Sequence, residues 1–264
     1  MIRVLLLAIF LAGAQPNQAE PTFARPEGAT AEVLAVLKGV AASSSLEELQ
    51  QTAAKGASLI ARQSPVAGVL SQLAEDRLSA DDLRAKLIDV RDGLAFEPLR
   101  EADLPDDFPT YTPPGIVELK TYPKSRRAVS DEFLPLFAHI TRNKIAMTAP
   151  VRMEYRPDDA GKLKQENMAF FYGDAQAGTL GADPQDNGVN TVADDGQTVV
   201  ALGQRGRWNR EIITQGERLL RDWLKDHPDY EASGEVAVMG YNSPMTPTAR
   251  QFFEIQLPVE KVDQ

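Results

Sequence analysis

The chain has 264 residues, of which 43% are hydrophobic and 25% charged, a composition typical of a globular protein with one or two domains and not of a disordered chain. Its formal net charge of −10 argues against nucleic acid and an anionic membrane surface as main partners, because like charges repel, and leaves only local basic patches open. It contains no Cys, which excludes disulfides and lipidation at a cleavage-site Cys.

The first fourteen residues have the pattern of a secretory signal peptide. Arg3 precedes an apolar run from Val4 to Leu11, and small residues follow at Ala12 and Ala14. The run is too short for a membrane span, so the alternative is an uncleaved interfacial anchor. We expect export to the periplasm or cell envelope, with a signal peptide over 1–14, a disordered lead over 15–29 and no transmembrane span.

Residues 30–97 predict four amphipathic helices. Ser45 and Glu48 form a capping-box sequence, Ser64-Pro65 restarts the chain, and Ser79 is placed to cap the last helix. None of the apolar stripes contains a ligand-like spacing. We therefore predict a helical accessory segment that packs on itself, on the next domain or on a protein partner.

Residues 98–115 are rich in Pro and acidic residues and lack periodicity, which is typical of a linker. The second domain, 116–260, then shows a strand–helix–strand–strand pattern twice. Its strands are expected at 116–122, 144–155, 168–172, 198–203, 235–241 and 250–259, its helices at 131–140 and 209–227, and a long loop at 173–196. Two such halves can close about eight strands into a barrel, which removes exposed strand edges.

Four segments of this domain resemble, in order and separation, the SOUL heme-binding proteins. They are VELKTYPKSRRAV (117–129), LFAHI with KIAMTAPVRMEY (136–155), MAFFY (168–172) and GYNSPMTP with FFEIQLPV (240–259). The resemblance implies an α+β fold, a distorted eight-stranded antiparallel barrel with two flanking helices. This is the doubled βαββ unit of the gyrase-inhibitor-like proteins, here preceded by a small all-α segment. It also implies a tetrapyrrole held against a hydrophobic surface.

By this resemblance the ligand lies beside the first helix of the barrel domain. The wall of the pocket is then expected to include Phe133, Phe137, Met147 and Met153. Aromatic and thioether side chains suit a flat macrocycle because they offer large, adaptable apolar contact. The simpler interpretation of both Met residues is barrel core.

Cations near this surface would pair with the propionates of a heme. Some relatives carry basic residues at the places of Ala138 and Thr246, so the nearby Arg142, Lys144 and Arg152 are the candidates here. The alternative for all three is a solvated rim.

Iron ligation has two candidate histidines. His139 lies in the first barrel-domain helix but off its Phe133, Phe137 and Ile140 stripe, so a surface position is expected rather than an axial ligand. His227 ends the long helix, where a His interacts favourably with the helix dipole. No metal site is evident from the residue spacing.

We therefore predict non-catalytic binding of heme or another flat apolar tetrapyrrole. One alternative is a small hydrolase of the wider fold that uses a cavity carboxylate, with Glu154 and Glu254 as candidates. Another is a protein-interaction module. No nucleophile elbow, HExxH motif or phosphate-binding loop occurs in the sequence.

Overall fold

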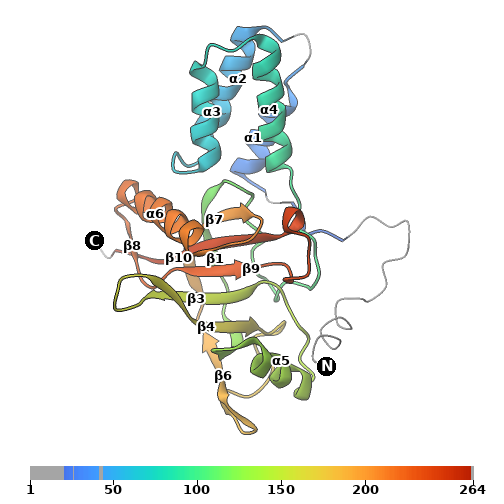
Figure 1. Cartoon of the computed structure of the whole chain (residues 1–264), viewed down its shortest axis with the longest axis vertical. Coiled ribbons are helices and arrows are strands. Elements are labelled where there is room, and N and C mark those ends of the chain that lie inside the picture. Colours follow the sequence, from blue (N-terminus) through green and yellow to red (C-terminus); the bar gives the residue numbers. More distant parts are fainter. Residues whose placement is uncertain (1–20, 26, 42–43, 263–264) are drawn as a thin grey trace.

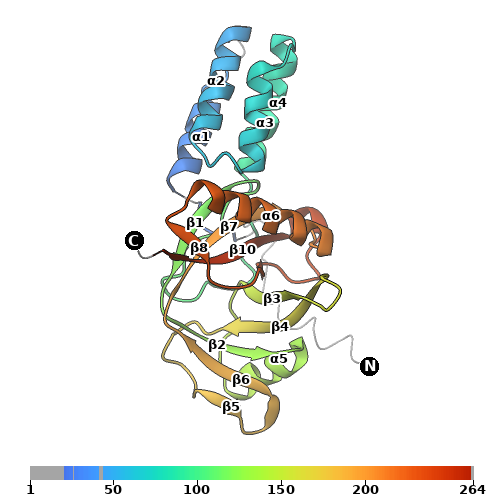
Figure 2. The same cartoon turned by 90° about the vertical axis from the view of Figure 1, so that its left-hand side faces the viewer.

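The computed structural model describes residues 21–25, 27–41 and 44–262, so the predicted signal peptide lies outside the described residues. Four helices stand at one end of a large β-sheet, and a fifth lies at the opposite end (Figures 1 and 2). Among the described helices, none is both long and apolar enough to cross a membrane.

The N-terminal helices match the pattern of the sequence. Ser45 accepts a hydrogen bond from the Glu48 amide, and Glu48 accepts one from the Ser45 amide, so the predicted capping box is confirmed. Their buried faces form one core that also includes Ile116 of the next domain. The four helices are α1 (Ala29–Lys38), α2 (Leu46–Ser58), α3 (Pro65–Glu75) and α4 (Ala80–Leu94).

The second domain contains the doubled unit, as β2–α5–β3–β4 and β7–α6–β9–β10, and the α+β class is confirmed. Its elements are β1 (Val117–Tyr122), β2 (Ser125–Ser130), α5 (Phe133–Arg142), β3 (Val151–Pro157), β4 (Leu163–Phe171), β5 (Gly181–Asp183), β6 (Asp186–Asp194), β7 (Gln197–Arg205), α6 (Arg210–Asp226), β8 (Tyr230–Ala232), β9 (Ala237–Gly240), the 3₁₀ turn η2 (Thr248–Arg250) and β10 (Phe252–Lys261).

The expected eight-stranded barrel is corrected to a bent antiparallel sheet of ten described strands that does not close. Its order is β1-β7-β10-β9-β3-β4-β2-β6-β5, with β8 paired to β10, which leaves β1 and β5 as edges. The sheet stays open because β1 and β5 each pair with a described strand on one side alone, and the chain bends at Lys124 between β1 and β2. β7 and β6 run alongside β1 and β2 across this point, since Tyr122 pairs with Gln197 and Ser125 with Asp194 in one unbroken register. The bent pair thereby contributes to both halves of the sheet.

Strand alternation gives this sheet two buried faces. On β10, Phe253 and Ile255 pack under α6, while Glu254 and Gln256 point to the opposite face. Gly216 lets α6 approach β10 closely, because a Cβ there would lie 2.3 Å from the Ile255 Cδ1. Helix α5 covers a separate patch on β2, β4 and β6.

The predicted linker, segment 98–115, packs in part against the sheet. Phe108 and Tyr111 are buried on the sheet face opposite α6. Gly203 of β7 makes this contact possible, since a Cβ there would lie 2.0 Å from the Thr112 carbonyl oxygen. Within the predicted lead, Phe23 is buried, and Thr22 bridges to Leu99. The few apolar residues of segment 98–115 therefore determine where it packs, although the segment is acidic and rich in Pro.

Two further element predictions are corrected. The strand expected over 144–155 begins only at Val151, so Met147 lies in an irregular segment before β3. The loop expected over 173–196 contains β5 and β6, and β6 pairs with β2.

Candidate functional site

Helix α5 carries an apolar surface that is open to solvent. Leu136 and Ile140 face the sheet and are buried, while Phe133 and Phe137 are half-buried beside them. The two rings are 6.0 Å apart between centroids and inclined by only 5°, so they lie in parallel. Phe133 is in turn held edge-on by Phe170 of β4 at 5.2 Å. The sheet thus fixes a pair of aromatic rings at the surface.

The end of α5 extends this surface. Lys144 has φ 55°, a left-handed conformation that ends a helix, and the chain then turns back so that the Ile145 amide donates to the Ile140 carbonyl. Ile145 and Met147 consequently pack against the same core as the two Phe rings and stay half-buried. Of the four predicted wall residues, Phe133, Phe137 and Met147 belong to one apolar surface, which we call the α5 surface together with Ile145.

Met153 lies elsewhere. It is 5% exposed and packs in the core under α6, where its Cε lies near Trp208 and Gly240. Met153 pairs with Val238 of β9, which belongs to the same core under α6, so its place along β3 puts it in that core and not beside α5. For Met153 the simpler interpretation, barrel core, describes its position.

The three cations that were predicted to pair with propionates lie in three different places. Lys144 is exposed at the end of α5. Arg142 bonds to the Asp183 carboxylate at 2.6 Å. Arg152 is 8% exposed and pairs with Glu154 at 2.9 Å on the face opposite α6, so it is not on the rim of the α5 surface. Its burial lowers its pKa below the usual value of an arginine.

His139 is buried, at 6% exposure, and the surface position expected for it is wrong. Its Nδ1 lies 2.6 Å from Asp183 of β5, and its Nε2 lies 2.7 Å from the Tyr172 hydroxyl. That hydroxyl also contacts Thr191 of β6 at 3.1 Å. Both ring nitrogens are therefore engaged, and the ring joins α5 to β5 and β6. The hydrogen bond from His139, with help from Arg142, lowers the pKa of Asp183 to about 2.

His227 has a structural role at the end of α6. Its ring stacks on Trp223 at 3.6 Å, and its Nδ1 lies 2.8 Å from the Trp223 carbonyl oxygen at the end of α6. This placement agrees with the prediction that His227 lies at the end of the long helix for structural reasons.

A second polar cluster lies on the sheet face opposite α6. Glu254 is fully buried and bonds to the Lys120 ammonium at 2.9 Å, to the Thr112 amide at 2.6 Å and to the Tyr241 hydroxyl at 3.0 Å. Gln256 donates to the other carboxylate oxygen at 2.5 Å. Burial opposes the charge on Lys120, but Glu254 outweighs it and raises the pKa of the amine. Both carboxylate oxygens of Glu254 are thus occupied by protein donors.

Glu154, the other candidate carboxylate, is half-buried between Arg127 and Arg152 and also accepts a bond from Asn167 at 2.8 Å. Burial opposes its ionisation, but Arg152 and these other partners hold its pKa below the usual range. It is therefore a structural acceptor in an ion-pair network.

Sequence reasoning did not find the partners of these groups. Asp183 lies in the segment that was predicted to be a loop. Lys120 lies at a polar position of a strand in which apolar and polar residues alternate. No periodic signal connects either of them to His139 or Glu254, which are distant along the chain. Among the described residues, no group of three or more His, Asp or Glu gathers as a metal site.

Comparison with known families gives one match, to the family described as SOUL heme-binding protein, over residues 107–258. This is more than half of the chain, and it begins after the four N-terminal helices. No curated protein matches the chain.

Solved structures of similar fold include a complex of EcmrR with DNA, at 15% identity and a TM-score of 0.44, which covers 55% of this chain and 57% of that one. The crystallised C-terminal domain of EcmrR shows 17% identity and a TM-score of 0.40, with 55% and 98% covered. A hydrolase from Listeria innocua shows 13% identity and a TM-score of 0.41, with 57% and 94% covered. At these values none of their activities transfers to this chain.

Proposed function

The chain belongs to the SOUL heme-binding protein family, and on this basis we propose that its sheet domain binds heme or a related flat tetrapyrrole without catalysing a reaction. The proposed site is the α5 surface. The observation that carries this choice is the parallel pair of half-buried rings, Phe133 and Phe137, that the sheet holds open to solvent.

This surface suits a macrocycle for physical reasons. Two parallel rings with a thioether beside them offer a flat apolar area, and burying such area contributes about 25 cal/mol per Å² before the costs of association. The exposed ammonium of Lys144 at the end of α5 is the cation placed to meet a propionate.

Iron ligation is secondary in this proposal. His139 is the histidine on α5, and its two nitrogens already bond to Asp183 and Tyr172. Ligation by it would require breaking one of these buried bonds, which costs about 1–3 kcal/mol for each polar group left without a partner. Apolar contact is therefore the main source of affinity.

A heme titration of the full chain, followed by the Soret band, tests the proposal. We expect saturable one-to-one binding with a shifted band. The broad spectrum of free or non-specifically adsorbed heme throughout the titration would contradict it.

The hydrolase alternative has less support. It would need a carboxylate open to a substrate and a water, whereas both oxygens of Glu254 accept bonds from buried protein donors. The protein-interaction role of the N-terminal helices stays a prediction.

A further inference from the structure

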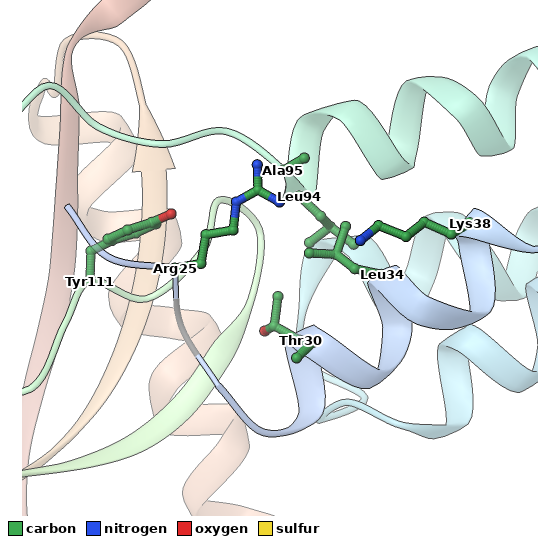
Figure 3. A pocket seen from close by; sticks show the side chains of 8 residues that line it. Arg25, Thr30, Leu34, Lys38, Leu94, Ala95 and Tyr111 are labelled. Carbon is green, nitrogen blue, oxygen red and sulfur yellow. The ribbon is translucent and has the colours of Figure 1, made fainter. Parts of the chain in front are cut away.

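A cavity of about 160 Å³ lies where the N-terminal helices meet the sheet domain. Figure 3 shows its wall: α1 on one side, the end of α4 on another, and Tyr111 opposite them. The cavity is far from the α5 surface, which lies at the other end of the molecule (Figure 1). It is thus independent of the function proposed above.

The wall on the helix side is mainly apolar, with the buried hydroxyl of Thr30 and the side chain of Lys38 as its polar members. Helix α1 buries Val33 and Leu37 in the core of the helical segment, and it turns a second face, with Ala31 and Leu34, to the cavity. Leu94 of α4 completes this wall at 3% exposure, beside Ala95. Ala31 is small and exposed, so it lies where the cavity meets solvent.

The charged residues that line the cavity are both basic, in a chain whose formal net charge is −10. Arg25 is paired with Glu97, so its charge is largely compensated. Lys38 has no ion-pair partner among the described residues, and its side chain runs back along α1 to bring the ammonium near Leu94 (Figure 3). The cavity therefore offers one uncompensated positive charge beside an apolar wall.

Tyr111 contributes its ring and not its hydroxyl. The hydroxyl donates to the Phe96 carbonyl at 3.0 Å, and burial raises the pKa of the group, so it stays neutral. Figure 3 shows the Arg25 side chain between this ring and the two leucines, and the ring and leucines together favour a guest with an apolar body.

We propose that this cavity binds a small carboxylate with an aryl or short alkyl body. The apolar body would lie against the Leu34 and Leu94 side chains beside the Arg25 stem, and the carboxylate would face the Lys38 ammonium. A cavity of ~150 Å³ accommodates a benzene ring, which sets the size of the body. Because its wall comes from both parts of the chain, a bound carboxylate would hold the helical segment to the sheet domain, and such junctions are common places for ligand sites.

Benzoate is the probe, with benzylammonium as a guest of similar size and opposite charge. We expect saturable shifts of the Leu34 and Leu94 methyl NMR signals when benzoate is added to the full chain, and none with benzylammonium. Lys38→Gln should weaken benzoate binding by about threefold or more, since a partly exposed ion pair is lost. Ala31→Leu should abolish it by blocking the cavity where it meets solvent.

Two controls define the site. Lys55→Gln makes the same change on the exposed face of α2 and should leave benzoate binding unchanged, as should Phe137→Ala on the α5 surface. Lys38 is exposed, so its substitution does not endanger the fold and decides the test by itself. Equal binding of benzoate and benzylammonium, no saturable binding of benzoate, or an unchanged affinity in Lys38→Gln would each overturn the proposal.

Discussion

The ammonium of Lys120 and the carboxylate of Glu254 form an ion pair at 2.9 Å, and their side chains are only 4% and 0% exposed. The pair joins β1 to β10, two strands that do not pair with each other but flank β7. Breaking it from one side leaves a buried charge without its partner. Lys120→Met should therefore destabilise the fold by about 3–5 kcal/mol, measured by urea unfolding.

The double variant Lys120→Met with Glu254→Gln is the control for that loss. The amide keeps an oxygen acceptor for the Thr112 amide and the Tyr241 hydroxyl but carries no charge. We expect it to recover much of the stability lost in the single variant. If the double variant were the less stable of the two, uncompensated charge would not explain the effect.

Asp183 should make the stability of the protein depend on pH in the acid range. Its folded-state pKa is about 2, below the value near 3.9 of an unfolded chain. A lowered carboxyl pKa stabilises the fold above the unfolded value, and this contribution is lost as the pH falls from about 4 to about 2. Asp183→Asn should lack this contribution. The difference in unfolding free energy between the two proteins should shrink over that range; a difference that stays constant would show that the ionised carboxylate is not its source.

Phe137→Ala should weaken heme binding by about tenfold or more. The change removes one of the two parallel rings, and burying a Phe side chain contributes about 1.5–3 kcal/mol. Leu119→Ala is the matched control, because Leu119 is a partly exposed apolar residue on β1, outside the α5 surface. Soret titrations of both variants check the prediction, which an equal loss in the control would contradict.

Iron-free porphyrin should bind about as well as heme, since both nitrogens of His139 are engaged within the protein. His139→Gln should weaken heme by less than about tenfold, or ~1.4 kcal/mol, provided that circular dichroism shows a folded chain. Loss of heme binding in this variant, together with failure of iron-free porphyrin to bind the natural protein, would identify His139 as an axial ligand.

Limited digestion with chymotrypsin should cut after Leu180 before it cuts after Tyr111. Leu180 is 52% exposed, while Phe108 and Tyr111 are buried against the sheet. Proteases need an accessible, locally unfolded segment. Mass spectrometry of the first fragments gives the order, and an initial cut within 98–115 would mean that this segment is a free linker after all.

Short-range sequence patterns were sufficient to predict the elements that depend on neighbouring residues. The capping box of Ser45 and Glu48 and the doubled strand–helix–strand–strand order can be read from neighbouring residues, because caps and hydrophobic periodicity act within a few positions. The stripe of Phe133 and Phe137 on α5 belongs to the same class.

Only the tertiary structure decided which face each of these residues meets. His139 lies off the apolar stripe, yet it is buried because Asp183 and Tyr172, which are 44 and 33 positions away, satisfy both of its nitrogens. Phe108 and Tyr111 lie in an acidic, Pro-rich stretch, yet they pack on a sheet face that exists only once β1, β7, β10 and β9 have paired. Such contacts depend on pairing between distant segments, and a polar residue with a distant partner has the same local pattern as one that faces water.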